Sequence, residues 1–292
     1  MITKAVIAAA GWSTRFLPAV KSYAKHLVPI LDKPQIQYII EECIAVGINQ
    51  ICIVYRDGDE TLKNYFSPDP QLEEYLQKTG KTDRIDSLRY IWQNVNHFEF
   101  ITQPQNLPYG NGTPILASET FIGQDSFAYF YGDDLTFEKT TGDYLKQMIQ
   151  VFNQYSADGV AATEKVQPED IRKGGSVKYT ENSQVPFQMD YAIEKPEPKD
   201  APSFNMLVSP FVFSPQIIPA LKNTAIAKGE LWLTDALNTL AKDHLVIAQP
   251  MTDAKWLTTG DPIAFIKSNL LYGLQSDKYR EQIIQLIHSL NI

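Results

Sequence analysis

The chain has 292 residues, a length within the range of a single large α/β domain. Hydrophobic residues make up 44% and charged residues 21%, the proportions of an ordinary soluble globular protein. The net charge of −8 argues against non-specific binding to nucleic acid, because that binding needs a basic surface. An anionic ligand would need a local cluster of cations and backbone amides.

The sequence predicts neither a signal peptide nor a membrane span. The first 11 residues are too short for a signal-peptide apolar core, and no apolar run reaches 18 residues. Cys43 lies in a predicted helix and Cys52 in a predicted strand, so both indicate buried thiols rather than a disulfide framework. We therefore expect a cytoplasmic protein.

The N-terminal half alternates between strand and helix patterns. Residues 4–10, KAVIAAA, are apolar throughout after Lys4, as in a buried parallel strand. A helix over 34–47 begins with Pro34, ends at Gly47 and leads to a strand over 48–56, which implies a right-handed crossover in a doubly wound sheet. Further predicted elements are a polar helical segment within 59–92, a strand at 98–102, a helix at 114–122 and a strand at 126–134.

The second half is more mixed, and it contains no internal repeat. The Pro-rich stretch 194–203 is predicted to be a loop, because the strands on both sides fit one sheet. The fold class is therefore α/β, a single Rossmann-like domain with a doubly wound mixed sheet and helices on both faces. The predicted elements are strands at 159–166, 176–180 and 206–214, and helices at 215–222, 230–243, 261–275 and 277–290.

The loop after the first strand suits a phosphate. Gly11 allows a tight turn that presents backbone N–H groups to phosphate oxygens. Arg15 can clamp two oxygens at once, and Lys25 can act as a point charge. The alternative is a plain strand-to-helix turn whose cations are solvated.

Two carboxylates, Asp133 and Asp134, follow Gly132 at the end of a strongly apolar strand. Ligands of open α/β sheets bind beyond the carboxyl ends of the strands, where carboxylates commonly hold Mg²⁺ that bridges phosphate oxygens. The alternative is a helix N-cap or an Asx turn, which Asp also favours. Two acids after a mostly apolar strand favour a metal site.

Two weaker signals complete the set. In Glu194-Lys195-Pro196, an adjacent acid and base can hold sugar hydroxyls and a phosphate, although the same tripeptide suits a solvated turn. The Gln103 amide is both donor and acceptor, as a uracil or thymine edge requires, and the loop 107–114 that follows contains Gly110. An ordinary polar strand end followed by a turn would look the same.

The order of these pieces resembles the bacterial UTP–glucose-1-phosphate uridylyltransferases, within the sugar-phosphate nucleotidyltransferase family. The resemblance runs from residue 4 to about residue 275, and the helical insert LEEYLQKTGK is typical of this branch. The matching pieces are KAVIAAAGWSTRFLPAVK, KHLVPILDKPQIQYIIEECIAVGI, LEEYLQKTGK, FAYFYGDDL, YAIEKP and GELWLTDALNTLAK.

This resemblance implies a reaction between UTP and α-D-glucose 1-phosphate with Mg²⁺, giving UDP-glucose and pyrophosphate without a protein nucleophile. It also implies a homo-oligomer, a dimer or a tetramer, with no nucleic-acid or membrane partner. It divides the domain into a nucleotide-binding half (1–135), a sugar-phosphate-binding half (136–275) and a C-terminal helix (276–292). The catalytic residues that it implies are Arg15, Lys25, Asp133 and Lys195.

The resemblance also implies the contacts of each substrate. Asp133 would bind the metal. The nucleotide-binding residues would be Ala10, Gly11, Thr14, Gln103 and Gly110. The residues that bind the sugar phosphate would be Gly175, Glu194 and Lys195.

The chain departs from the family pattern inside the inferred site. Ser13 replaces a glycine of the phosphate loop, and it would obstruct a backbone that must adopt a positive φ. His26 stands where this branch has an acid, and Thr258 stands where it has a second metal-binding aspartate, with Asp261 as a conceivable substitute. Two dipeptides also differ from the family, Ser209-Pro210 on the sugar side and Thr113-Pro114 near the base.

These departures leave two alternatives to the uridylyltransferase. One is the same chemistry with another sugar 1-phosphate or nucleotide. The other is a catalytically weak homologue that binds a nucleotide sugar. A dinucleotide-dependent dehydrogenase is set aside, because the first loop lacks Gly-x-Gly-x-x-Gly and no acid ends the second strand.

Overall fold

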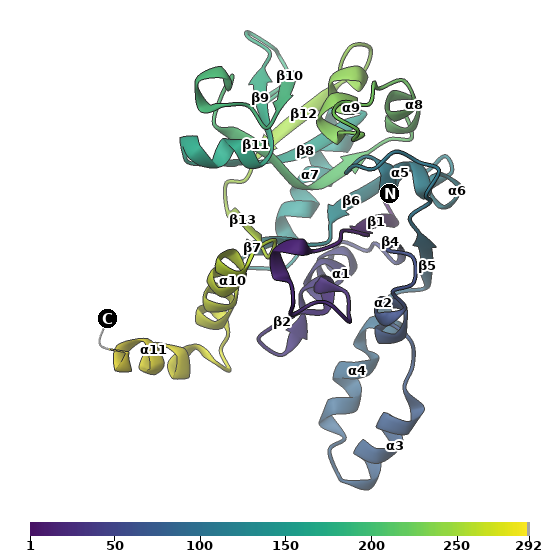
Figure 1. Cartoon of the computed structure of the whole chain (residues 1–292), viewed down its shortest axis with the longest axis vertical. Coiled ribbons are helices and arrows are strands. Elements are labelled where there is room, and N and C mark those ends of the chain that lie inside the picture. Colours follow the sequence, from purple (N-terminus) through teal and green to yellow (C-terminus); the bar gives the residue numbers. More distant parts are fainter. Residues whose placement is uncertain (291–292) are drawn as a thin grey trace.

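The computed structural model describes residues 1–290, and a mixed sheet of nine strands forms the centre of that part of the chain (Figure 1). The strand order is β10-β9-β11-β6-β1-β4-β5, and β8 pairs with β11 on one side and β12 on the other. The strands are β1 (Lys4–Ala9), β4 (Gln50–Tyr55), β5 (His97–Thr102), β6 (Phe127–Tyr131), β8 (Gly159–Lys165), β9 (Gly175–Tyr179), β10 (Met189–Glu194), β11 (Asn205–Phe213) and β12 (Val246–Pro250).

Two small antiparallel pairs lie outside this sheet. The strands β2 (Pro29–Ile30) and β3 (Lys33–Pro34) form one, and β7 (Asp134–Glu138) with β13 (Ala254–Thr258) forms the other. Short 3-10 turns are η1 (Thr14–Phe16), η2 (Lys25–Leu27), η3 (Pro168–Lys173) and η4 (Pro198–Asp200).

Helices flank the sheet, and the predicted fold class is confirmed. The polar segment within 59–92 forms three helices rather than one, and the helix predicted at 230–243 is shorter, because residues 230–232 lie in a loop. The helices are α1 (Gln35–Ala45), α2 (Thr61–Tyr65), α3 (Pro70–Lys78), α4 (Asp83–Asn94), α5 (Thr113–Ala117), α6 (Glu119–Ile122), α7 (Asp143–Tyr155), α8 (Ile217–Lys222), α9 (Leu233–Leu240), α10 (Pro262–Gln275) and α11 (Arg280–Ser289).

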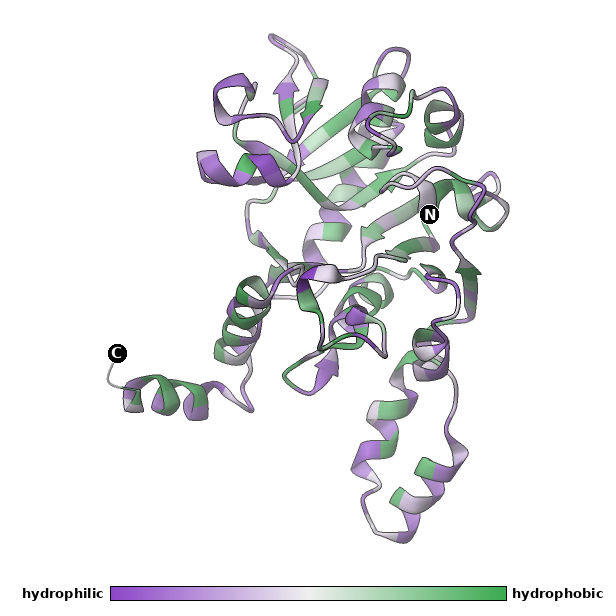
Figure 2. Ribbon diagram, viewed as in Figure 1, coloured by the Kyte–Doolittle hydropathy of each residue, from purple (hydrophilic) through white to green (hydrophobic). Residues whose placement is uncertain are grey.

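The sheet buries apolar side chains on both faces, as a doubly wound fold requires. In β1, Ile7 packs in one core with α1 and α7, while the neighbouring Val6 packs in the other core with α5, α8 and α9. Both side chains are fully buried. Figure 2 shows the result as a hydrophobic sheet with more polar helices outside it. This two-sided burial explains the continuous apolar run of residues 5–10.

Parallel pairing brings four strand ends to one edge of the sheet. The strand β1 pairs in parallel with β4 and β6, and β4 pairs in parallel with β5. The residues that follow these ends therefore share one edge, and they include Ala10, Gln103 and Gly132. Neighbouring strands lie about 5 Å apart, so Gln103 is roughly 14 Å across the sheet from β6.

Besides the two-residue strands β2 and β3, the sequence analysis missed four strands, and none of the four is apolar along its whole length. The edge strand β10 has only two buried residues, Met189 and Ala192, and β12 ends in Gln249-Pro250. The ribbon of β7 and β13 mixes polar and apolar side chains. Period-2 burial is weak in such short strands, so composition alone does not identify them.

Two helical segments extend from the body in Figure 1. The helices α3 and α4 form an arm, and α10 and α11 lead to the C-terminal end of the described chain. Figure 2 shows that the α3–α4 arm is largely polar. None of the helices within residues 1–290 combines the length and apolar character needed to cross a membrane.

Helix α1 buries an acidic residue, Glu42, which is only 4% exposed. Its Oε1 accepts a hydrogen bond of 3.1 Å from the Thr136 hydroxyl of β7. Burial first, and then the charge of Glu138, raise the pKa of Glu42 well above its ordinary value, although the Thr136 hydrogen bond opposes the shift. The folded protein therefore holds a proton on Glu42 that the unfolded chain releases.

We expect Glu42→Gln to raise the melting temperature, and to raise it more at pH 8 than at pH 5. Because the pKa of Glu42 is raised in the folded state, the wild type loses stability as the pH increases above the unfolded value of about 4.3. The substituted amide cannot titrate, and its oxygen can still accept from Thr136. Melting curves at the two pH values test this.

Glu41→Gln is the matched control, because Glu41 lies next in the chain and pairs with Lys33 at 2.5 Å. That variant should gain no stability at either pH. An equal difference between Glu42→Gln and the wild type at both pH values would contradict the buried-proton explanation.

Candidate active site

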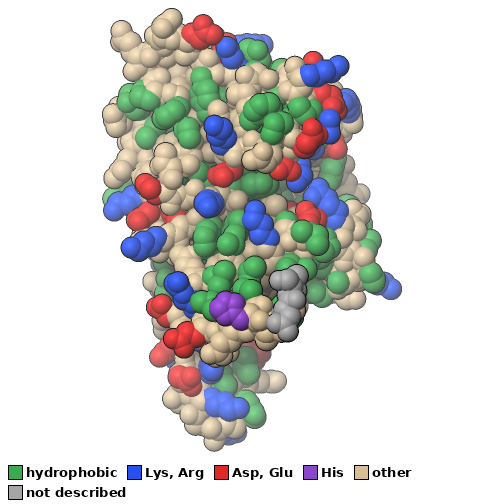
Figure 3. All heavy atoms as spheres, turned by 90° about the vertical axis from the view of Figure 1, so that its left-hand side faces the viewer, with side chains coloured by type: hydrophobic (Ala, Val, Ile, Leu, Met, Phe, Trp, Pro, Cys, Tyr) green, Lys and Arg blue, Asp and Glu red, His purple; other side chains and the backbone are tan. Residues whose placement is uncertain are grey.

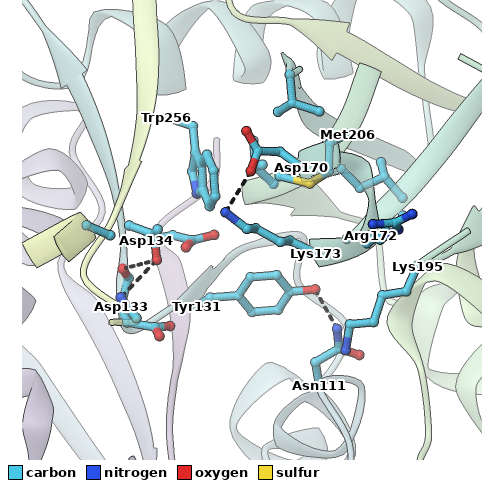
Figure 4. Close-up of a pocket in the computed structure, with 18 of the residues that line it drawn as sticks. Asn111, Tyr131, Asp133, Asp134, Asp170, Arg172, Lys173, Lys195, Met206 and Trp256 are labelled. Atoms are coloured by element: carbon cyan, nitrogen blue, oxygen red, sulfur yellow. Dashed lines mark hydrogen bonds and ion pairs between the residues drawn. The ribbon is translucent and has the colours of Figure 1, made fainter. Parts of the chain in front are cut away.

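A cavity of about 840 Å³ lies between the parallel strand ends and the β9–β11 half of the sheet. On the face shown in Figure 3, cationic and acidic side chains are interspersed rather than gathered into one basic stripe. Figure 4 shows the side chains that point into the cavity. Five predicted site residues line it: Arg15, Asp133, Gly175, Glu194 and Lys195.

Asp133 forms the centre of the nucleotide side. It lies in the turn between β6 and β7, and its Oδ2 accepts a short hydrogen bond from the Lys25 ammonium. Burial opposes ionisation of Asp133, but the charge and hydrogen bond of Lys25 outweigh it and hold the pKa of Asp133 below its ordinary value. No helix begins at this turn, so the alternative of a helix N-cap is wrong.

The phosphate loop confirms that position 13 needs an unusual backbone. Ser13 adopts a left-handed conformation with φ 57° and ψ 33°, at a cost of about 1–2 kcal/mol relative to a relaxed L-residue. Its hydroxyl donates to the Gly11 carbonyl at 3.2 Å. By contrast, Gly11 does not have a positive φ, and a Cβ there would meet no atom within 4 Å. Within the described chain, neither the backbone conformation nor the packing therefore requires a glycine at position 11.

The remaining residues of this loop lie at its open side. Thr14 begins η1 and is exposed, as is Arg15, whose guanidinium donates to the Gly260 carbonyl at 3.4 Å. Ala10 follows β1 directly. The loop therefore presents its polar groups outward, beside the Asp133 turn.

His26, one of the departures from the family pattern, is a buried and neutral side chain. It is 2% exposed, and its Nδ1 has no hydrogen-bond partner within the described chain. Burial and the adjacent Lys25 charge lower the pKa of His26 to about 3. A Cβ at Gly132 would lie 2.8 Å from the imidazole Cδ2, so Gly132 is required for the ring to pack under the Asp133 turn.

Thr258 lies beside Asp133, as the alignment with the family implies. Its hydroxyl donates to the Asp133 carbonyl at 3.3 Å and accepts from the Gly260 N–H at 3.1 Å. Asp261 has a different role from that of a metal ligand, because its Oδ1 caps α10 by accepting from the N–H groups of Ile263 and Ala264. Asp133 is therefore the carboxylate available at this wall.

The burial of Asp134 argues against a role for this residue as a metal ligand. It is 8% exposed, and its Oδ2 accepts from the Ser209 N–H at 3.4 Å. Burial and then the charge of Asp133 raise the pKa of Asp134 above its ordinary value. The Ser209-Pro210 departure thus supports Asp134 from the neighbouring strand, where β11 is irregular between Val208 and Phe211.

On the sugar side, Glu194 is held by a hydrogen bond of 2.5 Å from the Thr234 hydroxyl to its Oε2. A Cβ at Gly175 would lie 2.7 Å from that same hydroxyl oxygen. The absence of a side chain at Gly175 therefore leaves room for the Thr234 hydroxyl that binds Glu194. Burial raises the pKa of Glu194, and the hydrogen bond and Lys195 counteract the shift.

Lys195 is held in place by its backbone and by an aromatic ring. Its φ of 46° is left-handed, and its N–H donates to the Gly174 carbonyl at 3.1 Å. The ammonium lies 4.1 Å from the centre of the Trp232 ring and 3.7 Å from Glu194 Oε1. The Glu194 and Lys195 side chains are therefore held in place as one wall of the cavity, rather than solvated in an ordinary turn.

The predicted base-binding residues lie outside the lining of this cavity. Gln103 is half-buried at the end of β5, where its N–H donates to the Tyr55 carbonyl at 2.8 Å. Gly110 has φ 143°, and a Cβ there would lie 2.3 Å from the Leu231 carbonyl oxygen. Close approach to Leu231 is the physical reason for Gly110. Nearby, the Thr113 hydroxyl donates to the Pro108 carbonyl and begins α5.

The sequence analysis missed two polar residues that line the cavity, Tyr131 and Asn111. The Asn111 amide donates to the Tyr131 hydroxyl at 3.0 Å (Figure 4). In the sequence, Tyr131 is indistinguishable from the rest of the apolar strand before Gly132. No signal in the sequence separates it, because the last strand residue before a ligand-binding turn can point toward either the core or the ligand.

The side chains at this site fit a magnesium ion that is bound by one protein carboxylate and receives its other ligands from substrate phosphates and water. Within residues 1–290, no group of three His, Cys, Asp or Glu side chains is placed to hold a metal. Mg²⁺ is commonly held by one or two carboxylates, with substrate phosphates and water completing the shell. Asp133 lines the cavity beside Arg15 and can be such a carboxylate.

The chain matches the family described as "Nucleotidyl transferase" over residues 4–273. It is 34% identical over 293 residues to UTP–glucose-1-phosphate uridylyltransferase 1 of Staphylococcus saprophyticus, covering 99% of both chains. It is 31% identical to the UTP–glucose-1-phosphate uridylyltransferase of Bacillus subtilis, covering 99% of this chain and 97% of that one.

Solved structures agree with these relatives. The UTP-bound UDP-glucose pyrophosphorylase of Acinetobacter baumannii superposes with a TM-score of 0.89 at 31% identity, over 99% of this chain and 100% of that one. A UDP-glucose pyrophosphorylase in complex with UDP-glucose gives a TM-score of 0.83 at 31% identity, over 93% of this chain and 98% of that one. The chain therefore belongs to the nucleotidyl transferase family, in the branch of the UTP–glucose-1-phosphate uridylyltransferases.

Proposed function

We propose that the protein transfers a uridylyl group from UTP to α-D-glucose 1-phosphate, giving UDP-glucose and pyrophosphate. The observation that carries this proposal is that one cavity has the Asp133 and Arg15 wall on one side and the Glu194-Lys195 wall on the other. Both substrates are anionic, and the two walls offer separate cations to them. We place this activity in the cytoplasm and expect a homodimer or homotetramer.

The chemistry needs positioning and charge stabilisation rather than a nucleophilic side chain. A phosphate oxygen of the sugar 1-phosphate attacks the α-phosphorus of UTP, and the bond from that phosphorus to the oxygen shared with the β-phosphate breaks. Arg15 and Lys25 would hold the triphosphate, with Ala10, Gly11 and Thr14 at the loop backbone. Gln103 and Gly110 would meet the uracil edge across the ends of the parallel strands.

The sugar side would hold the acceptor in line with the triphosphate. Lys195 would bind the phosphate of the sugar, and Glu194 would accept from sugar hydroxyls, with Gly175 behind it. We also propose that Asp133 holds Mg²⁺, which when bound neutralises charge on the phosphate oxygens. Lys25 would then be released from Asp133 to contact a phosphate.

Two observations favour alternatives that the same assays distinguish. Ser209-Pro210 shapes the wall behind Asp134, so another sugar 1-phosphate or nucleotide is a second candidate. Thr258 has its hydroxyl engaged by the backbone, which favours a catalytically weak homologue. Turnover only with a different substrate pair would support the first, and nucleotide-sugar binding without turnover would support the second.

The first test is release of pyrophosphate from UTP, α-D-glucose 1-phosphate and Mg²⁺, with Asp133→Asn as the inactive variant. Loss of the carboxylate proposed to hold Mg²⁺ at the transferring phosphate should reduce turnover by about 10²–10³-fold. Asp170→Asn is the matched control, because Asp170 lines the same cavity but pairs with Lys173 at 2.7 Å. Equal rates for Asp133→Asn and the wild type would overturn the role of Asp133.

Lys195→Ala should raise the KM for glucose 1-phosphate, and should reduce kcat/KM by about 10–100-fold, while the KM for UTP changes little. The expected cause is loss of a charged donor to the sugar phosphate. Lys173→Ala removes another lysine of the same cavity and should have a much smaller effect. Steady-state kinetics with each substrate varied measures both, and similar losses in the two variants would refute a specific role for Lys195.

Thr258→Asp should lower the concentration of Mg²⁺ that gives half-maximal activity, because it adds a carboxylate next to Asp133. Binding of Mn²⁺ followed by electron paramagnetic resonance gives a readout independent of turnover. Thr258→Asn introduces a side chain of the same size as aspartate without the charge, and should leave the affinity unchanged. A metal affinity that is the same in all three proteins would place the ion away from Thr258.

A further inference from the structure

Tyr131 occupies the middle of the cavity, between its two walls. It is the last residue of β6, and its ring lies between Asp133 and Asp134 on one side and Lys195 on the other (Figure 4). The ring packs against Tyr129 at 5.7 Å and Phe211 at 5.4 Å between centroids, with steep interplanar angles of 85° and 65°. These contacts hold the hydroxyl at a defined place.

The hydrogen bonds around Asn111 decide which way the Tyr131 proton points. The Asn111 Oδ1 accepts from the Leu233 N–H at 2.7 Å, so its Nδ2 must be the atom directed at Tyr131. The Nδ2 donates to the Tyr131 hydroxyl oxygen at 3.0 Å. Tyr131 is thus the acceptor in this pair, and its own proton meets no acceptor elsewhere in the described chain.

Tyr131 also keeps that proton. A tyrosine phenol has an ordinary pKa of about 10, so the Tyr131 hydroxyl is protonated at neutral pH. At neutral pH the cavity therefore presents a fixed neutral donor between two charged walls.

We propose that the Tyr131 hydroxyl donates a hydrogen bond to a phosphate oxygen of the sugar 1-phosphate. The inference rests on the proposed function. The Tyr131 hydroxyl oxygen already accepts a hydrogen bond from Asn111, so the group is left to donate its own proton. Its partner should therefore be an oxygen that only accepts hydrogen bonds, and an anionic phosphate oxygen is the strongest such acceptor. The place midway between Asp133 and Lys195 is where the phosphate of the acceptor sugar must approach the nucleotide. Tyr131 then restrains that phosphate without adding a charge.

Tyr131→Phe tests the hydroxyl alone, because the ring contacts remain. We expect the KM for glucose 1-phosphate to rise, and kcat/KM to fall by about 10–100-fold, with the KM for UTP nearly unchanged. Galactose 1-phosphate, as a substrate or as a competitor, should lose affinity by the same factor, because it carries the same phosphate. A loss confined to one sugar would overturn the assignment to the phosphate.

Tyr129→Phe is the matched control. Tyr129 lies on the same face of β6, and its hydroxyl donates to the Asn111 carbonyl at 2.5 Å, so both variants remove one hydroxyl bonded to Asn111. Tyr129 is fully buried, and its loss should lower the melting temperature without changing the KM for glucose 1-phosphate. Equal kinetic effects of the two variants would show that Tyr131 only supports Asn111, and would overturn the proposal.

Direct binding separates this inference from the proposed function. Titration calorimetry with α-D-glucose 1-phosphate compares the wild type with Tyr131→Phe in the presence of Mg²⁺ and without turnover. A wild type with no pyrophosphate release would refute the proposed function, and the calorimetric comparison would still decide the role of Tyr131. Equal affinities in the two proteins would overturn it, and an affinity about 10–100-fold weaker in the variant would support it.

Discussion

The antiparallel pairing of β11 with β6 is the constraint on which the site depends. It sets Phe211 opposite Tyr129 and Phe213 opposite Phe127, while the other edge of β11 pairs with β8. One strand thus joins the parallel half of the sheet to the half that contains β9 and β10. Because Asp133 follows β6 and Glu194 ends β10, this pairing determines how far apart the two charged walls stand. The cavity lies where the parallel strands β1, β4 and β6 give way to β11, which runs antiparallel to β6.

Much of this architecture could be predicted from the sequence, for identifiable physical reasons. Strands such as β1 and β6 are buried on both faces, so they appear as continuous apolar runs that end at a turn. The polar residue after such a strand, Asp133, is at the edge where ligands bind, and the structure places it there. Lys195 was predicted from the family resemblance, and it shares the cavity with Asp133 although 62 residues separate them along the chain.

Other features depend on contacts that a linear pattern does not contain. The left-handed backbone of Ser13 could be anticipated only from the glycine of related chains, whereas the reason for Gly110 is a carbonyl of Leu231 more than a hundred residues away. Tyr131 could not be identified as a site residue, because the sequence does not show whether an aromatic residue at a strand end faces the core or the ligand. The ribbon of β7 and β13 escaped notice because neither strand alone buries enough apolar surface to have a pattern.

That ribbon begins directly after the turn that carries Asp133. Asp133 lies between β6 of the large sheet, which ends at Tyr131, and β7 of the ribbon, which begins at Asp134. The Ser268 hydroxyl of α10 donates to the Thr258 carbonyl, and the Thr258 hydroxyl in turn donates to the Asp133 carbonyl. Two hydrogen bonds thus connect α10 to the backbone of the turn that carries Asp133. The position of α10 therefore bears on the position of the Asp133 backbone.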